Sequence, residues 1–562
     1  MRREVSVVNK KVCSFPILFA LLALLIGTCA VVFPASAQAA PTSTGSITVS
    51  GTVASSYDAY QIFSANVIDG DNDAKIATDL AWVSDAVRDA ALPVLHSAGM
   101  SKSQTTAQEA AEWLNNDSHL TSALSAQLAR SLQSSVAVSE ALKAGTTAEL
   151  PCGYWLIVAD DDAISQGEAG TAPIMALVGG SAVTVKPKAA TPKVAKHVLE
   201  DSTAAWQKAA DATVGDDLYW CLSATVPAGL TAYDTYAVQF VDTMSAGLDP
   251  SKVAASVRVY VAAGADGGFD AVSAGKDGRA GTDPAKGWTD ITAQCATKVA
   301  ADGTFTVRTD DLVAALGGAD AFTAGARVVA VYNAPLNSAC NHGIAKGNPN
   351  EVYLRYPRSP FADQSGDAGF TRTPSDDACA YTWDLALTKR GSDGDKPLAG
   401  AVLSIADDRG RTLAADGMWD AEGKATVTTG EDGRVTVSGV DSGKLEVREL
   451  KAPKGYTAFE GTRSVTVKAE GLDVDQVAAA KPKLTITAES PLRADSADGS
   501  TGSLEASLIN TPTGTPPSIT TGGFMPSTGD MAMYAAAAAA VAGAALIVVA
   551  LLVKRGGGSH KE

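Results

Sequence analysis

The chain has 562 residues, 46% of them hydrophobic, which is enough for about three or four domains with cores of their own. Its formal net charge of −17 argues against nucleic acids and anionic membrane surfaces as partners. The sequence contains no GxSxG, HExxH, CxxC or phosphate-binding glycine motif, so it predicts no turnover enzyme, no cofactor and no metal site.

The N-terminus has the three parts of a secretory signal peptide. Lys10 and Lys11 precede an apolar run over residues 15–33, and small residues with A-x-A spacing follow. Residues 1–39 are therefore predicted to be removed and the mature protein to be exported. The length of the apolar run leaves an uncleaved membrane anchor as the alternative.

Export permits disulfides, and five cysteines remain in the mature chain. An odd number leaves at least one thiol free or paired between molecules, and the spacing does not assign the connectivity. Cys340 and His342 suggest a nucleophile and its base, but two positions apart they need not meet. A disulfide is the preferred interpretation for Cys340.

The mature chain divides into three β-rich segments. Residues 40–187 combine strands with helical insertions, and the stretch TTAQEAAEWL begins with a Thr105/Gln108 capping box. Residues 188–360 read almost entirely as strands and turns, residues 361–379 as a linker, and residues 380–512 as short alternating strands. The expected fold class is mostly β, with tandem immunoglobulin-like β-sandwich domains in an elongated rod.

In the middle segment, a lysine, an acid and an asparagine fall on the apolar faces of their strands. Alternate residues of a strand face one side, which places Lys196 with two valines, Asp242 with Phe240, and Asn350 with Val352. Asn348 has the same parity as Asn350, so the choice between the two asparagines stays open.

The third segment repeats the pattern. Lys389 follows Leu385 and Leu387 on one face, Glu449 shares a face with Val447, and Asn510 shares one with Leu508. Polar groups buried without partners are costly, so their presence on an apolar face requires a chemical reason. A hydrogen-bonded triad or exposed edge residues are the plainer alternatives.

The C-terminus begins with a Pro/Gly/Thr-rich linker over residues 513–524. The pentapeptide MPSTG follows, made of Met525, Pro526, Ser527, Thr528 and Gly529. Residues 531–553 are apolar and long enough to span a bilayer, and a short basic tail ends the chain. A simple tail-anchored membrane protein is the alternative.

These motifs carry a family resemblance. LTKRGSDGDKPLAGAVLSI, LEVRELKAPKGY and SLIN resemble a Cna-B type pilin domain, and the middle segment resembles a fimbrial isopeptide-forming domain. MPSTG with its apolar segment and basic tail resembles the LPxTG sorting signal of sortase substrates, with Met525 in the Leu position. SAVTVKPKAA resembles the pilin motif whose lysine follows a proline, here Lys188, although Lys186 stands at its Tyr position. Together they resemble a Gram-positive SpaA-like backbone pilin.

The resemblance implies two covalent layers. Lys389 would bond to Asn510 with Glu449 as proton shuttle, and Lys196 to Asn350 with Asp242. A sortase would join Thr528 of one copy to Lys188 of the next, with Lys186 as the second choice, and finally to a peptidoglycan precursor.

The expected partners follow from the same resemblance. They are a sortase of the pilin or housekeeping class, other copies of the chain, tip or basal pilins, and a host ligand. The rival interpretation is a monomeric wall-anchored adhesin with stiffened stalk domains.

Overall fold

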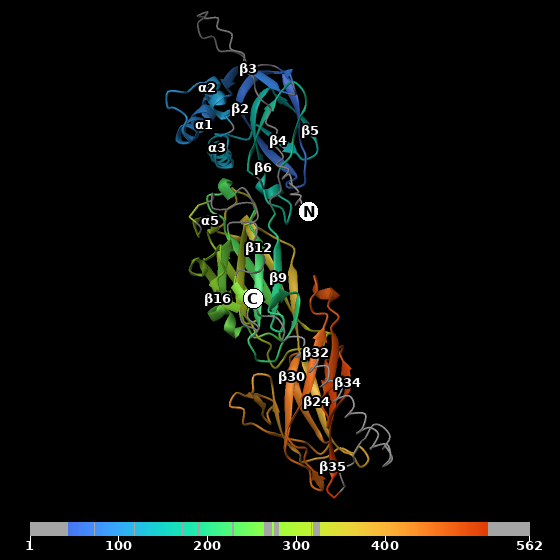
Figure 1. Cartoon of the computed structure of the whole chain (residues 1–562). Helices are drawn as coiled ribbons and strands as arrows, with labels where there is room; N and C mark the ends of the chain where they lie inside the picture. Colours follow the sequence, from blue (N-terminus) through green and yellow to red (C-terminus); the bar gives the residue numbers. More distant parts are fainter. Residues whose placement is uncertain are drawn as a thin grey trace, which may run out of the picture.

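The computed structural model describes residues 43–514, except 72–73, 117, 171, 188–190, 228–229, 263–271, 275–279, 316 and 319–325. Three β-rich parts follow one another along an elongated molecule (Figure 1). The predicted fold class, mostly β with sheets in tandem domains, is confirmed. The predicted signal peptide, sorting motif and apolar C-terminal segment lie outside the described residues.

The first domain packs two sheets and one helical layer. A three-stranded sheet has the order β5-β1-β8, and a five-stranded sheet has the order β3-β2-β6-β7 with β4 beside β2. The elements are β1 (Thr44–Val49), β2 (Ser56–Asp69), β3 (Lys75–Trp82), α1 (Asp85–Ser97), α2 (Ala107–Leu114), α3 (Ser122–Ser135), β4 (Glu140–Lys143), β5 (Thr147–Pro151), β6 (Gly153–Ala159), β7 (Ile174–Val178) and β8 (Val183–Val185).

The helices of this domain start where side chains cap their free N–H groups. Ser84 caps α1, Thr121 caps α3, and Thr106 with Glu109 forms a reciprocal capping box on α2. The box expected at Thr105 and Gln108 is therefore displaced by one residue, because Glu109 can accept from the N–H groups at both 105 and 106.

The middle domain is a sandwich of a six-stranded sheet, β10-β9-β12-β20-β14-β17, and a sheet built on β11-β23-β21-β13-β19-β18 with β22 beside β21. Its strands are β9 (Val194–Glu200), β10 (Ala205–Gln207), β11 (Ala209–Asp211), β12 (Tyr219–Thr225), β13 (Val238–Met244), β14 (Arg258–Ala262), β15 (Val272–Ala274), β16 (Ala280–Pro284), β17 (Trp288–Asp290), β18 (Cys295–Val299), β19 (Thr304–Thr309), β20 (Arg327–Asn333), β21 (Asn348–Pro357), β22 (Phe370–Arg372) and β23 (Asp376–Tyr381). The short helices are α4 (Val253–Ser256) and α5 (Leu312–Ala315). Its large apolar core lies between the two sheets.

The segment 361–379, predicted as a linker, contains β22 and most of β23. Both strands hydrogen-bond antiparallel to β21, so this segment completes a sheet of the middle domain instead of hanging between domains. Its composition, rich in Asp, Ser, Thr and Gly, is typical of linkers, but β23 lies between β11 and β21, and four of its six residues are buried.

The third domain packs two sheets around its own core. One has the order β29-β24-β35-β31 with β34 beside β35, and the other has the order β27-β26-β25-β30-β32-β33 with β28 beside β25. The strands are β24 (Trp383–Gly391), β25 (Val402–Ala406), β26 (Thr412–Leu413), β27 (Trp419–Asp420), β28 (Val427–Thr428), β29 (Arg434–Val440), β30 (Gly443–Lys451), β31 (Tyr456–Thr457), β32 (Thr462–Glu470), β33 (Lys483–Ala488), β34 (Leu492–Asp498) and β35 (Ser503–Pro512). The first and last strands, β24 and β35, are parallel neighbours.

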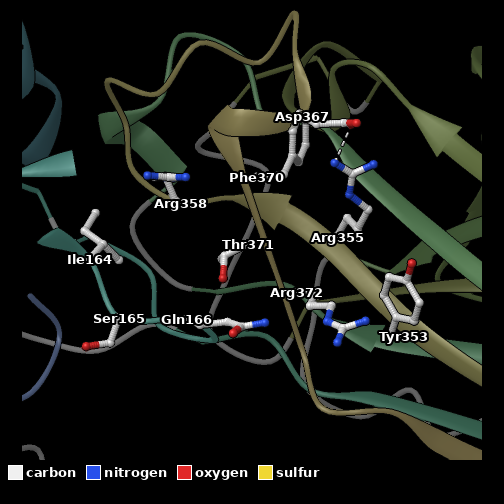
Figure 2. A pocket seen from close by; sticks show the side chains of 10 residues that line it. All are labelled: Ile164, Ser165, Gln166, Tyr353, Arg355, Arg358, Asp367, Phe370, Thr371 and Arg372. Atoms are coloured by element: carbon white, nitrogen blue, oxygen red, sulfur yellow. Dashed lines mark hydrogen bonds and ion pairs between the residues drawn. The ribbon is translucent and has the colours of Figure 1, made fainter. Parts of the chain in front are cut away.

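The first two domains meet at a junction held by backbone contacts. Gly167 N–H donates to Thr371 Oγ1 at 2.9 Å, and Tyr356 Oη donates to the Gly167 carbonyl at 2.9 Å. Beside these contacts, residues of both domains line a pocket of about 390 Å³ (Figure 2).

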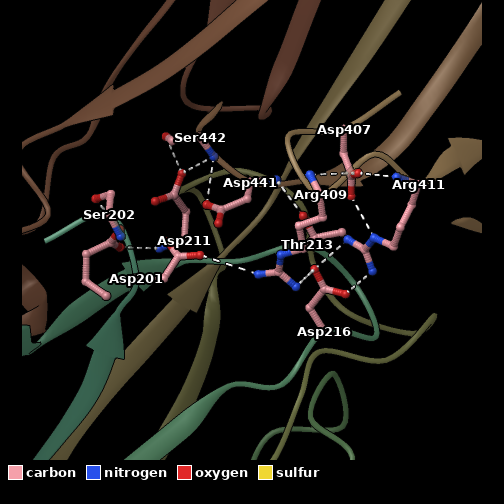
Figure 3. Close-up of polar contacts among 11 residues, drawn as sticks. Asp201, Ser202, Asp211, Thr213, Asp216, Asp407, Arg409, Arg411, Asp441 and Ser442 are labelled. Carbon is pink, nitrogen blue, oxygen red and sulfur yellow. Dashed lines mark hydrogen bonds and ion pairs between the residues drawn. The ribbon is translucent and has the colours of Figure 1, made fainter. Parts of the chain in front are cut away.

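The second and third domains meet through charged groups (Figure 3). Arg411 of the third domain donates to both carboxylate oxygens of Asp216 in the second, and Arg409 Nη1 donates to Asp216 at 2.9 Å. Asp211 Oδ2 accepts from Trp383 Nε1 at 2.6 Å and from the Ser442 backbone N–H at 2.9 Å. These bonds cross between the domains and fix their contact.

Buried carboxyl groups crowd the same junction. Burial, and then the charge of Asp211, raises the pKa of Glu200 from its ordinary value of 4.5 to about 7. Burial and the nearby Asp211, Asp201 and Glu200 raise the pKa of Asp441 well above the usual range. The folded junction therefore favours protonated carboxyl groups.

This crowding predicts a pH-dependent stability. A carboxyl whose pKa is higher in the folded state does not lower the free energy of unfolding below its unfolded pKa. It lowers that free energy progressively as the pH rises from about 4.5 to 7. Glu200→Gln removes the titration, so its Tm relative to wild type should rise by several degrees between pH 4.5 and 7.5, measured by calorimetry. Glu446→Gln, at an exposed position of β30, is the control, and its Tm relative to wild type should change little with pH. A difference that stays flat with pH would contradict the prediction.

No helix in the described ranges is long and apolar enough to cross a bilayer.

Candidate functional site

The third domain brings Lys389, Glu449 and Asn510 together, as the strand parity predicts. Burial alternates along β24, β30 and β35, and each of the three residues falls on a buried position. Lys389 pairs with Leu508 in the parallel register and Asn510 pairs with Gly391, so the lysine and the asparagine are offset by two residues on one face. Glu449 reaches them from the facing sheet.

The three side chains form one contact network. Asn510 Nδ2 donates to Glu449 Oε1 at 2.9 Å and to Oε2 at 3.0 Å, and the Phe459 N–H donates to Oε2 at 3.1 Å. Lys389 Nζ lies 3.8 Å from Glu449 Oε1 and donates to the Leu508 carbonyl at 3.1 Å. The side chains of Lys389 and Glu449 have no solvent exposure. The lysine amine, the acid and the amide therefore share one dry site.

Burial weakens the charged form of the lysine. It lowers the pKa of Lys389 to about 8, and the Glu449 charge opposes this shift only in part. A neutral amine is consequently accessible near physiological pH. Asn510 Oδ1 has no hydrogen-bond partner among the described residues, so the amide oxygen is available to a proton donor.

The middle domain places Lys196, Asp242 and Asn350 in a second buried site. All three have 0% exposure. Lys196 comes from β9 in one sheet, whereas Asp242 and Asn350 come from β13 and β21, which are neighbours in the other sheet. This site therefore lies between the sheets, and Lys196 Nζ forms a close ion pair with Asp242 Oδ2 across the core.

Tyr332 on β20 is the hub of this second site, and the sequence reasoning missed it. Its hydroxyl accepts from Lys196 Nζ at 2.9 Å and from Asn350 Nδ2 at 2.8 Å, and donates to Asp242 Oδ2 at 3.0 Å. The signal available in the sequence was parity, since Tyr332 shares the inward face of β20 with Val328 and Ala330.

The lysine of the second site is shifted in the same direction as that of the first. Burial lowers the pKa of Lys196 to about 8, against the opposing charge of Asp242. Burial also raises the pKa of Asp242, again against the pull of the lysine. Both shifts favour the neutral pair, an amine and a carboxylic acid. Asp242 Oδ1 and Asn350 Oδ1 have no hydrogen-bond partners among the described residues.

Asn348, the competing asparagine, is occupied elsewhere. Its Oδ1 accepts from the Asn341 N–H at 2.8 Å, and its Nδ2 donates to the carbonyls of Asn341 and Ala380. It therefore serves the backbone of a nearby loop, while Asn350 faces the lysine.

The other predicted site residues are placed only in part. Val185 is buried and Lys186 is exposed, but Lys188 lies outside the described residues, as do residues 525–529. The described part of the chain contains no cluster of three or more His, Cys, Asp or Glu side chains suited to a metal ion.

The five cysteines of the mature chain form no disulfide, so the disulfide expected at Cys340 is wrong. Cys340 is buried in the middle core and contacts the side chain of His342, whose Nδ1 lies 2.7 Å from Asp384 Oδ1. Four of the five cysteines are buried, and the half-buried Cys295 has its Sγ 2.9 Å from Thr309 Oγ1.

Comparisons with known proteins identify part of the chain. Residues 384–481 match the family model of the SpaA prealbumin-like fold domain. A segment of 143 residues is 30% identical to the trypsin-resistant surface T6 protein of Streptococcus pyogenes serotype M6, and covers 24% of this chain and 24% of that protein.

Two solved structures are also similar. The T6 backbone pilin of S. pyogenes serotype M6 has 17% identity and a TM-score of 0.45, with 84% of this chain and 98% of that one covered. The full-length major pilin SpaD of Corynebacterium diphtheriae has 16% identity and a TM-score of 0.40, with 67% and 84% covered. The chain therefore contains a SpaA prealbumin-like domain, and its resemblance to SpaA-like backbone pilins is confirmed in that domain.

Proposed function

We propose that this protein is a structural subunit of a covalent surface pilus, stiffened by intramolecular Lys–Asn isopeptide bonds. The observation that carries the proposal is the pair of dry sites in successive domains, each holding a lysine, an acid and an asparagine. Similarity to proteins described as a surface protein, a backbone pilin and a major pilin supports it.

The chemistry of each bond starts from the buried lysine, whose pKa is lowered to about 8 in both sites. A proton moves from the lysine ammonium to Glu449 or Asp242, which leaves a nucleophilic amine beside a carboxylic acid. The acid then polarises the amide oxygen, which has no other partner, while the lysine nitrogen attacks the amide carbon. A C–N bond to the lysine forms while the C–N bond to the amide nitrogen breaks. The acid gives its proton to the amide nitrogen, which leaves as ammonia, and the resulting carboxylate takes the surplus proton from the attacking nitrogen.

At Asn510 the amide nitrogen donates to the glutamate, which suits an ionised acid. A half-turn of the amide group presents its oxygen to the protonated acid instead. The turn exchanges the two bonds from Asn510 Nδ2 for one to Oδ1, which has no partner to give up.

The positions of the bonds suit a protein under tension. A pull along the chain enters the third domain through β24 and leaves through β35, and a bond between Lys389 and Asn510 ties these parallel strands directly. A bond between Lys196 and Asn350 ties β9, the first strand of the middle domain, to β21, which is followed in that domain only by β22 and β23. The load then passes through covalent bonds, so the sandwiches cannot unravel.

The polymer itself would form outside the folded domains. A sortase would cleave between Thr528 and Gly529 and transfer the Thr528 carbonyl to Lys188 of another copy, with release of the apolar tail. The last copy would go to a peptidoglycan precursor, and tip or basal pilins and a host ligand would complete the fibre. The exported protein would thus be held at the membrane briefly and then fixed to the cell wall.

Thr528→Ala tests the sorting step. The variant should be absent from the wall fraction released by muramidase and should form no high-mass ladder on a denaturing immunoblot, because no acyl-enzyme can form. The protein should instead remain with the membrane. Normal wall recovery would contradict the proposal, and a wild-type protein recovered only as one wall-bound band would favour the monomeric adhesin.

A further inference from the structure

A row of arginines crosses one face of the middle domain. Arg308 on β19 pairs with Gln239 on β13, Gln239 pairs with Arg355 on β21, and Arg355 pairs with Arg372 on β22. Residues directly opposite in antiparallel strands share a face, and like charges there repel. Three guanidinium groups in one row of a chain with net charge −17 therefore require a reason.

The protein neutralises this row only partly. Arg308 pairs with Asp310 and Arg355 with Asp367, each at 2.6 Å, but both acids are largely exposed, so their pairing is screened. Arg372 is exposed, its guanidinium lies 5.0 Å from the centroid of the Tyr353 ring, and no acid is within ion-pair distance of it among the described residues. Arg372 is thus a cation with unused hydrogen-bond donors.

The row ends at the pocket between the first two domains (Figure 2). Arg355, Arg372 and a further arginine, Arg358, line it together with one acid, Asp367. Arg358 donates to the Asp161 carbonyl at 3.0 Å and is 3.9 Å from the exposed Asp162. The lining therefore keeps an excess of positive charge.

The opposite wall comes from the first domain, and two of its three residues are polar. It consists of Ile164, Ser165 and Gln166, and the exposed side chain of Gln166 makes no hydrogen bond to the described residues. The next residue, Gly167, is bonded to Thr371 and Tyr356 of the middle domain, which fixes the two walls to each other. The pocket is therefore a preformed site with free donors on both sides.

We infer that this pocket binds an acidic saccharide unit, a sugar bearing one carboxylate or sulfate group. Guanidinium groups bind such oxyanions through paired hydrogen bonds, and Arg372 with Arg358 would supply them. A volume of about 390 Å³ exceeds what a bare oxyanion fills and lies within the range of small-molecule sites. Gln166 would serve the sugar hydroxyl groups from the first domain. The inference is independent of the isopeptide bonds and of polymerisation.

The test uses three sugars that differ only at C6: glucose, glucuronate and glucose 6-sulfate. Ligand-observed NMR titrations on the full mature protein at low salt should show saturable binding of one or both anions and none of glucose. Binding should weaken on raising the salt, because the charges are partly exposed. The sugar that binds identifies the source of the anion.

Variants locate the site. Arg372→Gln should weaken binding about tenfold, the effect of one charge-assisted bond pair. Gln166→Ala, on the other domain, should also weaken it. Arg493→Gln, an exposed arginine paired with Asp495 on β34 of the third domain, is the matched control and should bind as wild type.

Three results of the sugar titrations would overturn the inference. They are equal binding of glucose, equal binding of inorganic sulfate and glucose 6-sulfate, and no saturation of either anionic sugar below about 10 mM. Equal binding of glucose would show that the charge is not recognised. Equal binding of sulfate would show that the sugar is not recognised, and the absence of saturation would show that there is no site. An Arg372→Gln protein that binds as wild type while Arg493→Gln does not would move the site elsewhere.

Discussion

The reduced mature protein is expected to weigh about 34 Da less than its sequence requires, because each of two Lys–Asn bonds releases one ammonia of about 17 Da. Intact-protein mass spectrometry measures this deficit once the N-terminus is defined. Tandem spectra of protease digests should contain two branched peptides, one joining Lys196 to Asn350 and the other joining Lys389 to Asn510.

Removing one acid should remove one bond. Glu449→Ala deletes the proton carrier and leaves both reacting partners in place, so the deficit should halve to about 17 Da. Asp242→Ala should do the same for the middle domain. The matched controls lie on the same strands but face solvent, Glu446→Ala on β30 and Thr243→Ala on β13, and should keep the full deficit.

Loss of a bond should also cost stability. By the chain-entropy estimate for a crosslink that closes a loop of this length, the third domain loses roughly 4–5 kcal/mol. Glu449→Ala should therefore melt many degrees lower and be cut faster by trypsin. Lys389→Met keeps the side-chain volume but removes the amine, so it should lose the bond without forming a cavity. Its Tm and its rate of cleavage by trypsin should therefore change as in Glu449→Ala.

The masses can contradict the assignment in distinct ways. A wild-type mass equal to the sequence mass would reject both sites. A single deficit that Glu449→Ala abolishes would confirm the third domain and reject the assignment in the middle one.

Polymerisation is expected to disappear completely in Lys188→Ala. No other nucleophile would then follow Pro187, so denaturing immunoblots should show the monomer and no ladder of higher bands. Lys188 is not one of the residues proposed to form the two internal bonds. The monomer should therefore keep its Tm and its mass deficit.

Lys186→Ala is the internal control for this result. Lys186 is exposed directly after the buried Val185, so it shares the accessibility that the linkage requires. It should leave the ladder unchanged. A ladder that persists in Lys188→Ala and vanishes only in Lys186→Ala would assign the linkage to the neighbouring lysine.

The sequence alone predicted the β-rich class and five of the six residues that we propose to react. Strand parity is a local property with a period of two, so Lys389, Glu449 and Asn510 could be placed on inward faces without knowing which strands are neighbours. The same holds for Lys196 and Asp242. Composition misled in segment 361–379, whose polar residues are typical of linkers but form β22 and most of β23, a strand that lies between β11 and β21.

The tertiary structure decided everything that depends on which strands and domains meet. Parity could not separate Asn350 from Asn348, and only the position of the Asn341 loop shows that Asn348 is already occupied. Tyr332 comes from the sheet that faces Asp242 and Asn350. Arg308 and Arg372 join one row only through the register of four strands. Such contacts link residues far apart in the chain, and the packing of whole sheets sets them, so no pattern within a single strand encodes them.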